Sequence, residues 1–204
     1  MAFQRPFRTL KKWKQTLREL ALHILDIAEN SISANADEIK IIVEEDLQKD
    51  ILRILIQDNG KGMDAETLAK ITDPFITSRK TRSVGLGIPF FKAAAEACQG
   101  SFTIHSVPGK GTSVEAVFRH SHIDRMPLGN IESTLITLLM GTPEIHWIFE
   151  YRNNESCFIF DDQPIKETLE GIPLSEPAVM RYIREMIETG IQEVHLSGIM
   201  EATH

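Results

Sequence analysis

The sequence contains little cysteine and no long hydrophobic segment. Its 204 residues include only two cysteines, Cys98 and Cys157, which lie far apart. This excludes a disulfide framework, and it excludes a zinc or iron–sulfur site built from cysteine pairs. No uninterrupted apolar run reaches the ~18 residues that a membrane helix needs, and nothing resembles a secretory signal. We therefore expect no membrane span, and a reducing cytoplasm as the compartment.

The composition is otherwise that of a globular protein, with 42% hydrophobic and 25% charged residues, and the length allows one or two domains. A net charge of −7 argues against general nucleic-acid binding. The charge is unevenly distributed, because residues 1–18 carry six basic and no acidic residues, whereas residues 121–204 carry 14 acidic and 5 basic ones. We divide the chain into a basic helical arm (1–15), a central domain (16–120) and an acidic C-terminal domain (121–204).

The apolar residues of the basic arm recur at intervals of three and four, which places them on one face of a helix. They are Phe3, Phe7, Leu10, Trp13 and Leu17. Three interpretations stay open for this arm. It packs on its own domain or on a second copy, it lies on an anionic membrane surface, or it is a mitochondrial transit peptide.

The pattern from Thr16 to about Asn35 predicts an amphipathic helix with a polar stripe of Glu19, His23, Asp26, Asn30 and Ser33. Asp26 and Asn30 lie one turn apart on the same side, so both can address one ligand. A solvated helix face has the same pattern. Two apolar runs follow, at 39–45 and 51–57, and predict a β-hairpin.

Two glycine-containing loops follow the hairpin. The first loop comes directly after the second strand and has the sequence Asp58-Asn59-Gly60-Lys61-Gly62. Its glycines let a ligand approach the backbone closely, and Asp58 can accept a hydrogen bond from an exocyclic amine. The loop 73–87 is rich in cations and hydroxyls and ends in Gly85-Leu86-Gly87, before a predicted helix at 88–98. Such a loop at a helix N-terminus suits a polyphosphate. Taken singly, each loop also fits an ordinary turn or a solvated loop.

A second hairpin ends the central domain, with strands at 102–106 and 114–118 around the turn Pro108-Gly109-Lys110-Gly111-Thr112. After residue 120 we predict a small α/β unit. Its helices are predicted at 131–140, 164–169 and 176–189, the last with Ser175 as N-cap, and its strands at 145–151 and 157–160.

The order of these sequence motifs along the chain resembles that of the GHKL family of ATP-binding domains. This family includes gyrase B subunits, heat-shock chaperones, histidine kinases and MutL-type repair proteins. There is no P-loop motif. The resemblance covers about residues 16–120. It implies an α+β fold, a two-layer α/β sandwich known as the Bergerat ATP-binding fold, followed here by the small α/β C-terminal unit.

The resemblance implies Mg²⁺ and ATP as ligands. It implies that Asn30 coordinates magnesium. It also implies that Asp26 is the carboxylate that activates water in the members of the family that hydrolyse ATP. The side chain of Asp26 is one methylene shorter than that of the glutamate usual at this position. It assigns Asp58 to the adenine amine, with Gly60 and Gly62 shaping the pocket. Its remaining nucleotide contacts are Thr77, Ser78, Arg79, Gly85, Leu86, Gly87 and Thr112.

The run from Phe75 to Arg79 is similar to a histidine-kinase motif, so the resemblance favours kinases. The few residues before position 16 leave no room for a helical hairpin that carries a phosphoacceptor histidine. His23 lies on the same predicted helix as Asp26 and Asn30, so we do not expect it to be the phosphoacceptor. We therefore expect phosphorylation or regulation of a partner protein in trans. The alternative is an ATP-binding or slowly hydrolysing switch. The chain also resembles stand-alone kinase-like ATPases associated with iron-only hydrogenase gene clusters. We expect the acidic C-terminal unit to dock a partner or to form a homodimer.

Overall fold

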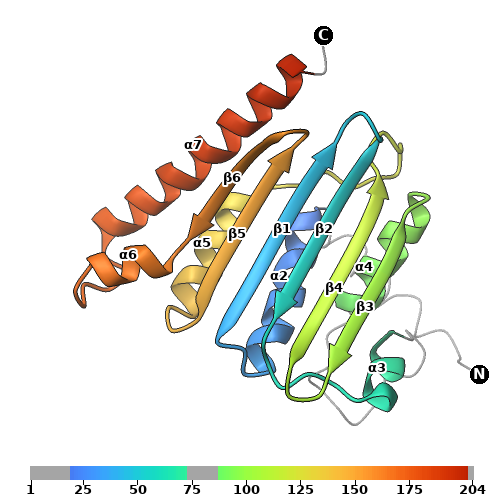
Figure 1. Cartoon of the computed structure of the whole chain (residues 1–204), viewed down its shortest axis with the longest axis horizontal. Helices are drawn as coiled ribbons and strands as arrows, with labels where there is room; N and C mark the ends of the chain where they lie inside the picture. Colours follow the sequence, from blue (N-terminus) through green and yellow to red (C-terminus); the bar gives the residue numbers. More distant parts are fainter. Residues whose placement is uncertain (1–18, 73–86, 202–204) are drawn as a thin grey trace, which may run out of the picture.

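In the computed structural model, which describes residues 19–72 and 87–201, a mixed sheet of six strands forms the centre of the molecule (Figure 1). The strands are β1 (Glu38–Asp46), β2 (Ile51–Asp58), β3 (Ser101–Val107), β4 (Gly111–Arg119), β5 (His146–Asn153) and β6 (Ser156–Asp161). Their order across the sheet is β3-β4-β2-β1-β5-β6. Neighbouring strands run antiparallel, except that β1 and β5 are parallel.

Helices cover one face of this sheet, so the fold has two layers (Figure 1). The helices are α2 (Leu20–Ser33), α3 (Ala65–Thr72), α4 (Gly87–Ala97), α5 (Ile131–Gly141), α6 (Gln163–Thr168) and α7 (Pro177–Glu201). Helix α2 packs against α4 and α5, and α7 packs against α5, β5 and β6. The expected α+β class and two-layer sandwich are confirmed. Among the described helices, none is long and apolar enough to cross a membrane.

The core lies between the sheet and α2. Ile39, Ile41 and Val43 alternate along β1 and are completely buried, as are Leu20 and Ile24 of α2. These side chains belong to one hydrophobic cluster, and each such burial stabilises the fold by roughly 1.5–3 kcal/mol relative to exposure. The predicted hairpin is confirmed, because β1 pairs with β2 from Ile39 to Asp46. This core holds the C-terminal half of α2 beside the end of β2.

The segment after residue 120 continues the same sheet. Strand β5 lies beside β1, with His146 opposite Glu38 at one end and Asn153 opposite Glu45 at the other. All the predicted helices and strands of this segment are present. The last helix is longer than predicted and begins at Pro177, so Ser175 is not adjacent to its first residue. Its buried residues continue at helical spacing beyond the predicted end, through Ile191 and Val194.

Two local features differ from the prediction. The polar stripe of α2 is not uniformly solvated, because His23 is only 1% exposed and its ring stacks on Phe91. Helix α3 was not predicted, although Asp64 marks its start: the backbone N–H of Thr67 donates to Asp64 Oδ1 at 2.7 Å. The basic arm and most of the predicted basic loop lie outside the described residues.

Candidate functional site

A hollow of about 240 Å³ lies beside α2, at the end of the sheet where β2 stops and β4 begins. It is lined by Ile27, Asn30, Ser31, Ser33, Ala34, Asp58, Lys61, Gly62, Met63, Thr67, Ile71, Ile88, Thr112 and Val114. Four of the residues singled out in the sequence, Asn30, Asp58, Gly62 and Thr112, therefore meet there. Much of the remaining lining is apolar, which suits a flat, largely apolar ring system with a few polar contacts at its edge.

The Asp58 carboxylate is held by three hydrogen bonds. The Ser31 hydroxyl donates to Oδ2 at 2.7 Å, and the backbone N–H groups of Gly60 and Thr112 donate to Oδ1 at 3.0 and 3.1 Å. An ionised carboxylate has about four acceptor positions. Asp58 is therefore fixed in orientation and still able to accept a hydrogen bond from a ligand in the hollow.

Ser31 is the residue of this site that the sequence analysis missed. Its side chain is 4% exposed and lies four residues after Ile27, whose carbonyl its hydroxyl also contacts at 3.4 Å. A small polar residue within the apolar row of an amphipathic helix was the available signal. Its partner is 27 positions away in the sequence, so local pattern alone did not identify it.

Glycine is required where the two glycine-containing turns meet. Gly62 has φ +63°, and a Cβ there would lie 2.0 Å from the carbonyl oxygen of Val107. Gly111 has φ +105°, and a Cβ there would lie 1.9 Å from the carbonyl oxygen of Asp58. Both positions combine a left-handed backbone with a close backbone approach. The turns therefore pack directly on each other and set the position of Asp58.

Asn59 and Ser106 fix the first glycine loop from two sides. The Asn59 Oδ1 atom accepts from the backbone N–H groups of Asp37 and Glu38, each at 3.0 Å. The Ser106 hydroxyl accepts from the Met63 backbone N–H at 2.8 Å and lies 2.9 Å from the Thr112 hydroxyl. The loop is thus joined to the start of β1 and to β3 and β4, which makes it a preformed surface.

Asp26 lies apart from the hollow, one turn before Asn30 and against the start of α4. A Cβ placed on Gly87 would be 2.8 Å from both Cβ and Oδ2 of Asp26. Burial, and then the neighbouring charge of Glu29, raise the pKa of the Asp26 carboxyl. A raised pKa makes an ionised carboxylate a stronger base, which is the property that a general base needs. The Asn30 side chain lines the hollow and has no hydrogen bond to the described part of the chain.

The structure places the remaining predicted residues as follows. Gly60 lies beside the Ala34 carbonyl and donates to Asp58, and Gly87 begins α4. Thr77, Ser78, Arg79, Gly85 and Leu86 lie outside the described residues. His23 is buried, and burial lowers the pKa of its imidazole to about 4. An imidazole enclosed in this way is not accessible as a phosphoacceptor.

Comparison with known proteins gives a family and a fold. Residues 11–122, more than half of the chain, match the family described as "Histidine kinase-, DNA gyrase B-, and HSP90-like ATPase". The chain is 43% identical over 89 residues to the sensor protein kinase FleS of Pseudomonas aeruginosa, a match that covers 44% of this chain and 22% of FleS. It is 35% identical over 101 residues to the signal transduction histidine-protein kinase AtoS of Escherichia coli, covering 49% and 16% of the two chains.

The match thus spans about a fifth or less of the length of these two sensor kinases. Among solved structures, the N-terminal domain of a DNA repair protein is similar with a TM-score of 0.52 and 15% identity, over 71% of this chain and 52% of that chain. At this identity the likeness concerns the fold alone. The chain belongs to the family of histidine kinase-, DNA gyrase B- and HSP90-like ATPases, and residues 11–122 contain its ATP-binding domain.

Proposed function

We propose that this protein binds Mg²⁺-ATP in the hollow beside α2 and uses it to phosphorylate, or otherwise regulate, a partner protein in trans. The observation that carries the proposal is the Asp58 carboxylate, which three donors hold in place at the wall of a largely apolar hollow. Adenine has a flat ring and an exocyclic amine. In this proposal the ring lies between the apolar walls, and the amine donates to Asp58.

Asn30 is a residue of the right kind for magnesium. Asn30 lines the same hollow, and no hydrogen bond to the described part of the chain occupies its side-chain amide. Mg²⁺ prefers oxygen ligands and keeps several waters, so one amide oxygen together with the nucleotide phosphates is a fitting set. Asn30 would hold the ion, and the ion would supply charge neutralisation at the phosphates.

Two reactions are compatible with this arrangement. In phosphotransfer, an acceptor side chain of the partner bonds to the γ-phosphorus while the bond to the β–γ bridging oxygen breaks and ADP leaves. In hydrolysis, water takes the place of the acceptor, and Asp26 removes its proton. The raised pKa of Asp26 favours the second reaction, whereas the two sensor kinases that resemble this chain favour the first.

The partner is a protein that this chain would recognise outside the nucleotide hollow. We assign its docking to the acidic segment 121–204, which carries a net charge of −9. A homodimer is the other arrangement that this segment could support. Because of the resemblance to ATPases of iron-only hydrogenase gene clusters, we include proteins of a hydrogenase system among the candidate partners.

The reaction can be tested with purified protein, Mg²⁺ and γ-labelled ATP. Free phosphate and protein-bound label are followed separately, with and without candidate partners, beside an Asn30→Ala variant. Label on a partner that is lost with Asn30→Ala supports phosphotransfer in trans. Free phosphate alone, lost in the same variant, supports the hydrolysing switch. Either product formed equally by Asn30→Ala would contradict the role of Asn30.

A further inference from the structure

A groove of about 420 Å³ lies between α7 and β6, at the edge of the sheet away from the nucleotide hollow. Strand β6 is the outermost strand there (Figure 1). Gly190 lets α7 lie close to this strand, because a Cβ at that position would be 2.2 Å from the Phe158 ring. The lining of the groove combines apolar side chains with two carboxylates, and it includes Phe158, Tyr182, Met186, Glu185 and Glu193.

The face of α7 along this groove carries exposed apolar side chains at both ends. Tyr182 is 59% exposed and Leu196 is 58% exposed. Between them, Met186, Thr189 and Glu193 follow at steps of three and four, which places all five residues on one face of the helix. From residue 182 to residue 196 this stripe is about 21 Å long, at about 1.5 Å per residue. A row of exposed apolar side chains with charged neighbours is typical of an interaction surface.

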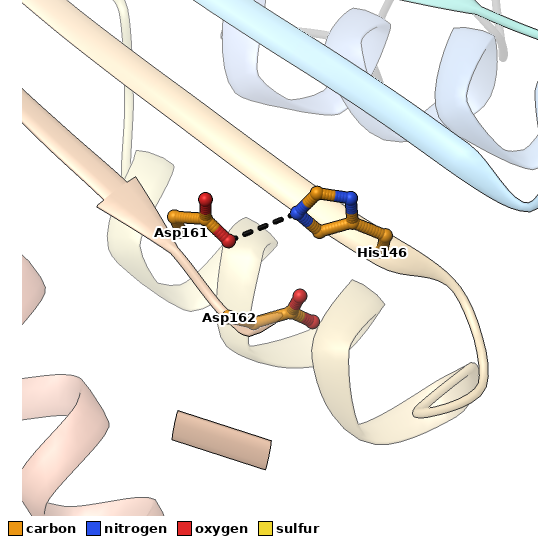
Figure 2. Close-up of side chains that lie close together, drawn as sticks. All are labelled: His146, Asp161 and Asp162. Atoms are coloured by element: carbon orange, nitrogen blue, oxygen red, sulfur yellow. Dashed lines mark hydrogen bonds and ion pairs between the residues drawn. The ribbon is translucent and has the colours of Figure 1, made fainter. Parts of the chain in front are cut away.

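The groove also carries negative charge that the described part of the chain does not neutralise. Its lining includes Glu185 and Glu193 but no lysine or arginine, and neither glutamate has an ion pair within residues 19–72 and 87–201. The acidic residues that end β6 differ in this respect. Figure 2 shows Asp161 bonded to His146, at 2.9 Å, and the next residue, Asp162, pairs with Lys166 at 2.8 Å. The groove therefore fits a partner that is both basic and apolar.

The N-terminal arm of this protein has that chemistry. Residues 1–18 carry six basic and no acidic residues. The predicted apolar stripe of the arm runs from Phe3 to Leu17, which as a helix is also about 21 Å long. A buried aromatic side chain covers about 150–250 Å², so Phe3, Phe7 and Trp13 from each of two exchanged arms would bury about 900–1,500 Å². A specific interface needs roughly 1,000 Å².

The position of α2 decides which copy supplies the arm. Helix α2 begins at Leu20, and α5 lies between α2 and α7 (Figure 1). Two helix spacings therefore separate Leu20 from α7, or about 16–20 Å. Leu17 is three residues from Leu20, and three extended residues span at most about 11 Å. A helical arm thus does not reach the groove of its own chain.

We propose that the arm of a second copy docks as an amphipathic helix in the groove between α7 and β6, and that two chains exchange arms in this way. The arrangement is a symmetric dimer in which the same two surfaces meet twice. The proposal specifies the homodimer that we named for the acidic segment, and in that respect it rests on the proposed function. It involves none of the residues assigned to ATP, so it can fail while ATP binding holds, and the reverse.

Arm docking can be measured on the full chain without nucleotide. The chain has two tryptophans, Trp13 and Trp147, so Trp147→Phe makes Trp13 the only emitter. We expect its fluorescence to shift to the blue as protein concentration rises, together with dimer formation in analytical ultracentrifugation. Both should reverse in about 1 M salt, where the Debye length is about 3 Å. Sedimentation of the unmodified chain keeps the test independent of the Trp147→Phe substitution. A monomer at all concentrations would overturn the proposal, and so would a dimer whose Trp13 emission stays that of an exposed tryptophan.

Charge reversal tests the groove itself. Glu185→Lys/Glu193→Lys should weaken the dimer at least about tenfold, because like charges then face each other. Asp124→Lys/Glu144→Lys changes the net charge equally at exposed positions outside the groove and should dimerise as the unmodified chain does. Lys11→Glu/Lys14→Glu should also weaken the dimer, and combining it with the groove reversal should restore it. Equal weakening by the control pair, or no restoration in the combined variant, would contradict docking in this groove.

Discussion

His23 makes the stability of this domain depend on pH in a way that a single substitution should remove. Its imidazole is 1% exposed and stacks on Phe91 with ring centroids 5.5 Å apart, and neither ring nitrogen has a hydrogen-bond partner among residues 19–72 and 87–201. Burial lowers its pKa from 6.5 to about 4. Between these values the unfolded chain binds a proton that the folded chain does not, so acid favours unfolding.

The size of the effect follows from the two pKa values. Each unit of difference is worth about 1.4 kcal/mol, so at pH 4 the folded state should lose about 3 kcal/mol relative to its stability above pH 6.5. The perturbation that tests this is His23→Leu, which has a similar volume and no titrating group. Because the variant lacks the buried imidazole, it should not show this part of the loss.

The assay is urea unfolding of both proteins at several pH values from 7 to 4.5, followed by circular dichroism. The difference in unfolding free energy between them isolates His23, since other titrating groups affect both proteins alike. We expect this difference to shift in favour of His23→Leu by roughly 2–3 kcal/mol across the range. His105→Leu, at an exposed histidine, should show no such shift. A constant difference for His23→Leu would refute the reasoning.

Three further predictions concern the site itself. Ser31→Ala removes a hydrogen bond to the Asp58 carboxylate and should raise the Kd for ATP about tenfold. Ser197→Ala, at an exposed serine whose hydroxyl donates to a carbonyl of its own helix, should leave the Kd unchanged. Gly62→Ala should cost at least about 2 kcal/mol in urea unfolding, because it adds a clash to a strained backbone; Gly109→Ala, with φ +73° and open space, should cost only the strain, and equal costs would contradict the packing argument. Asp26→Asn should lower the steady-state rate of ATP hydrolysis by a factor of about 10²–10⁴ with little change in ATP affinity. The rate of the unmodified chain should fall as pH drops through the raised pKa of Asp26, because the base must be ionised. A normal rate of hydrolysis in the variant would contradict the role of Asp26 as the base.

Most of the elements could be predicted because their signals are local. The alternation of Ile39, Ile41 and Val43 marks a strand, and the glycines of the Asp58 loop mark a tight approach of the backbone. The order of the sequence motifs, which resembles one family, predicted that Asp58 and Thr112 belong to the same site. Their contact, the Thr112 N–H donating to Asp58, agrees with that grouping.

What the sequence could not supply depends on contacts between distant segments. The parallel pairing of β5 with β1 joins residues more than 100 positions apart, and no local pattern encodes it. In the sequence, Ser31 does not differ from the other small residues of α2, because its hydrogen bond to Asp58 joins two distant segments. Helical periodicity places His23 in a polar stripe of α2. It does not show that Phe91 of α4 stacks on the imidazole ring.

The central claim, that Asp58 recognises ATP in the hollow beside α2, is tested most directly by calorimetric titration of Mg²⁺-ATP into three proteins. These are the unmodified chain, Asp58→Ala, and Asp124→Ala as a control at an exposed aspartate. We predict that Asp58→Ala, folded as judged by circular dichroism, weakens ATP binding roughly 10- to 150-fold, and that Asp124→Ala binds as the unmodified chain does. A folded Asp58→Ala variant with unchanged ATP affinity would contradict the account.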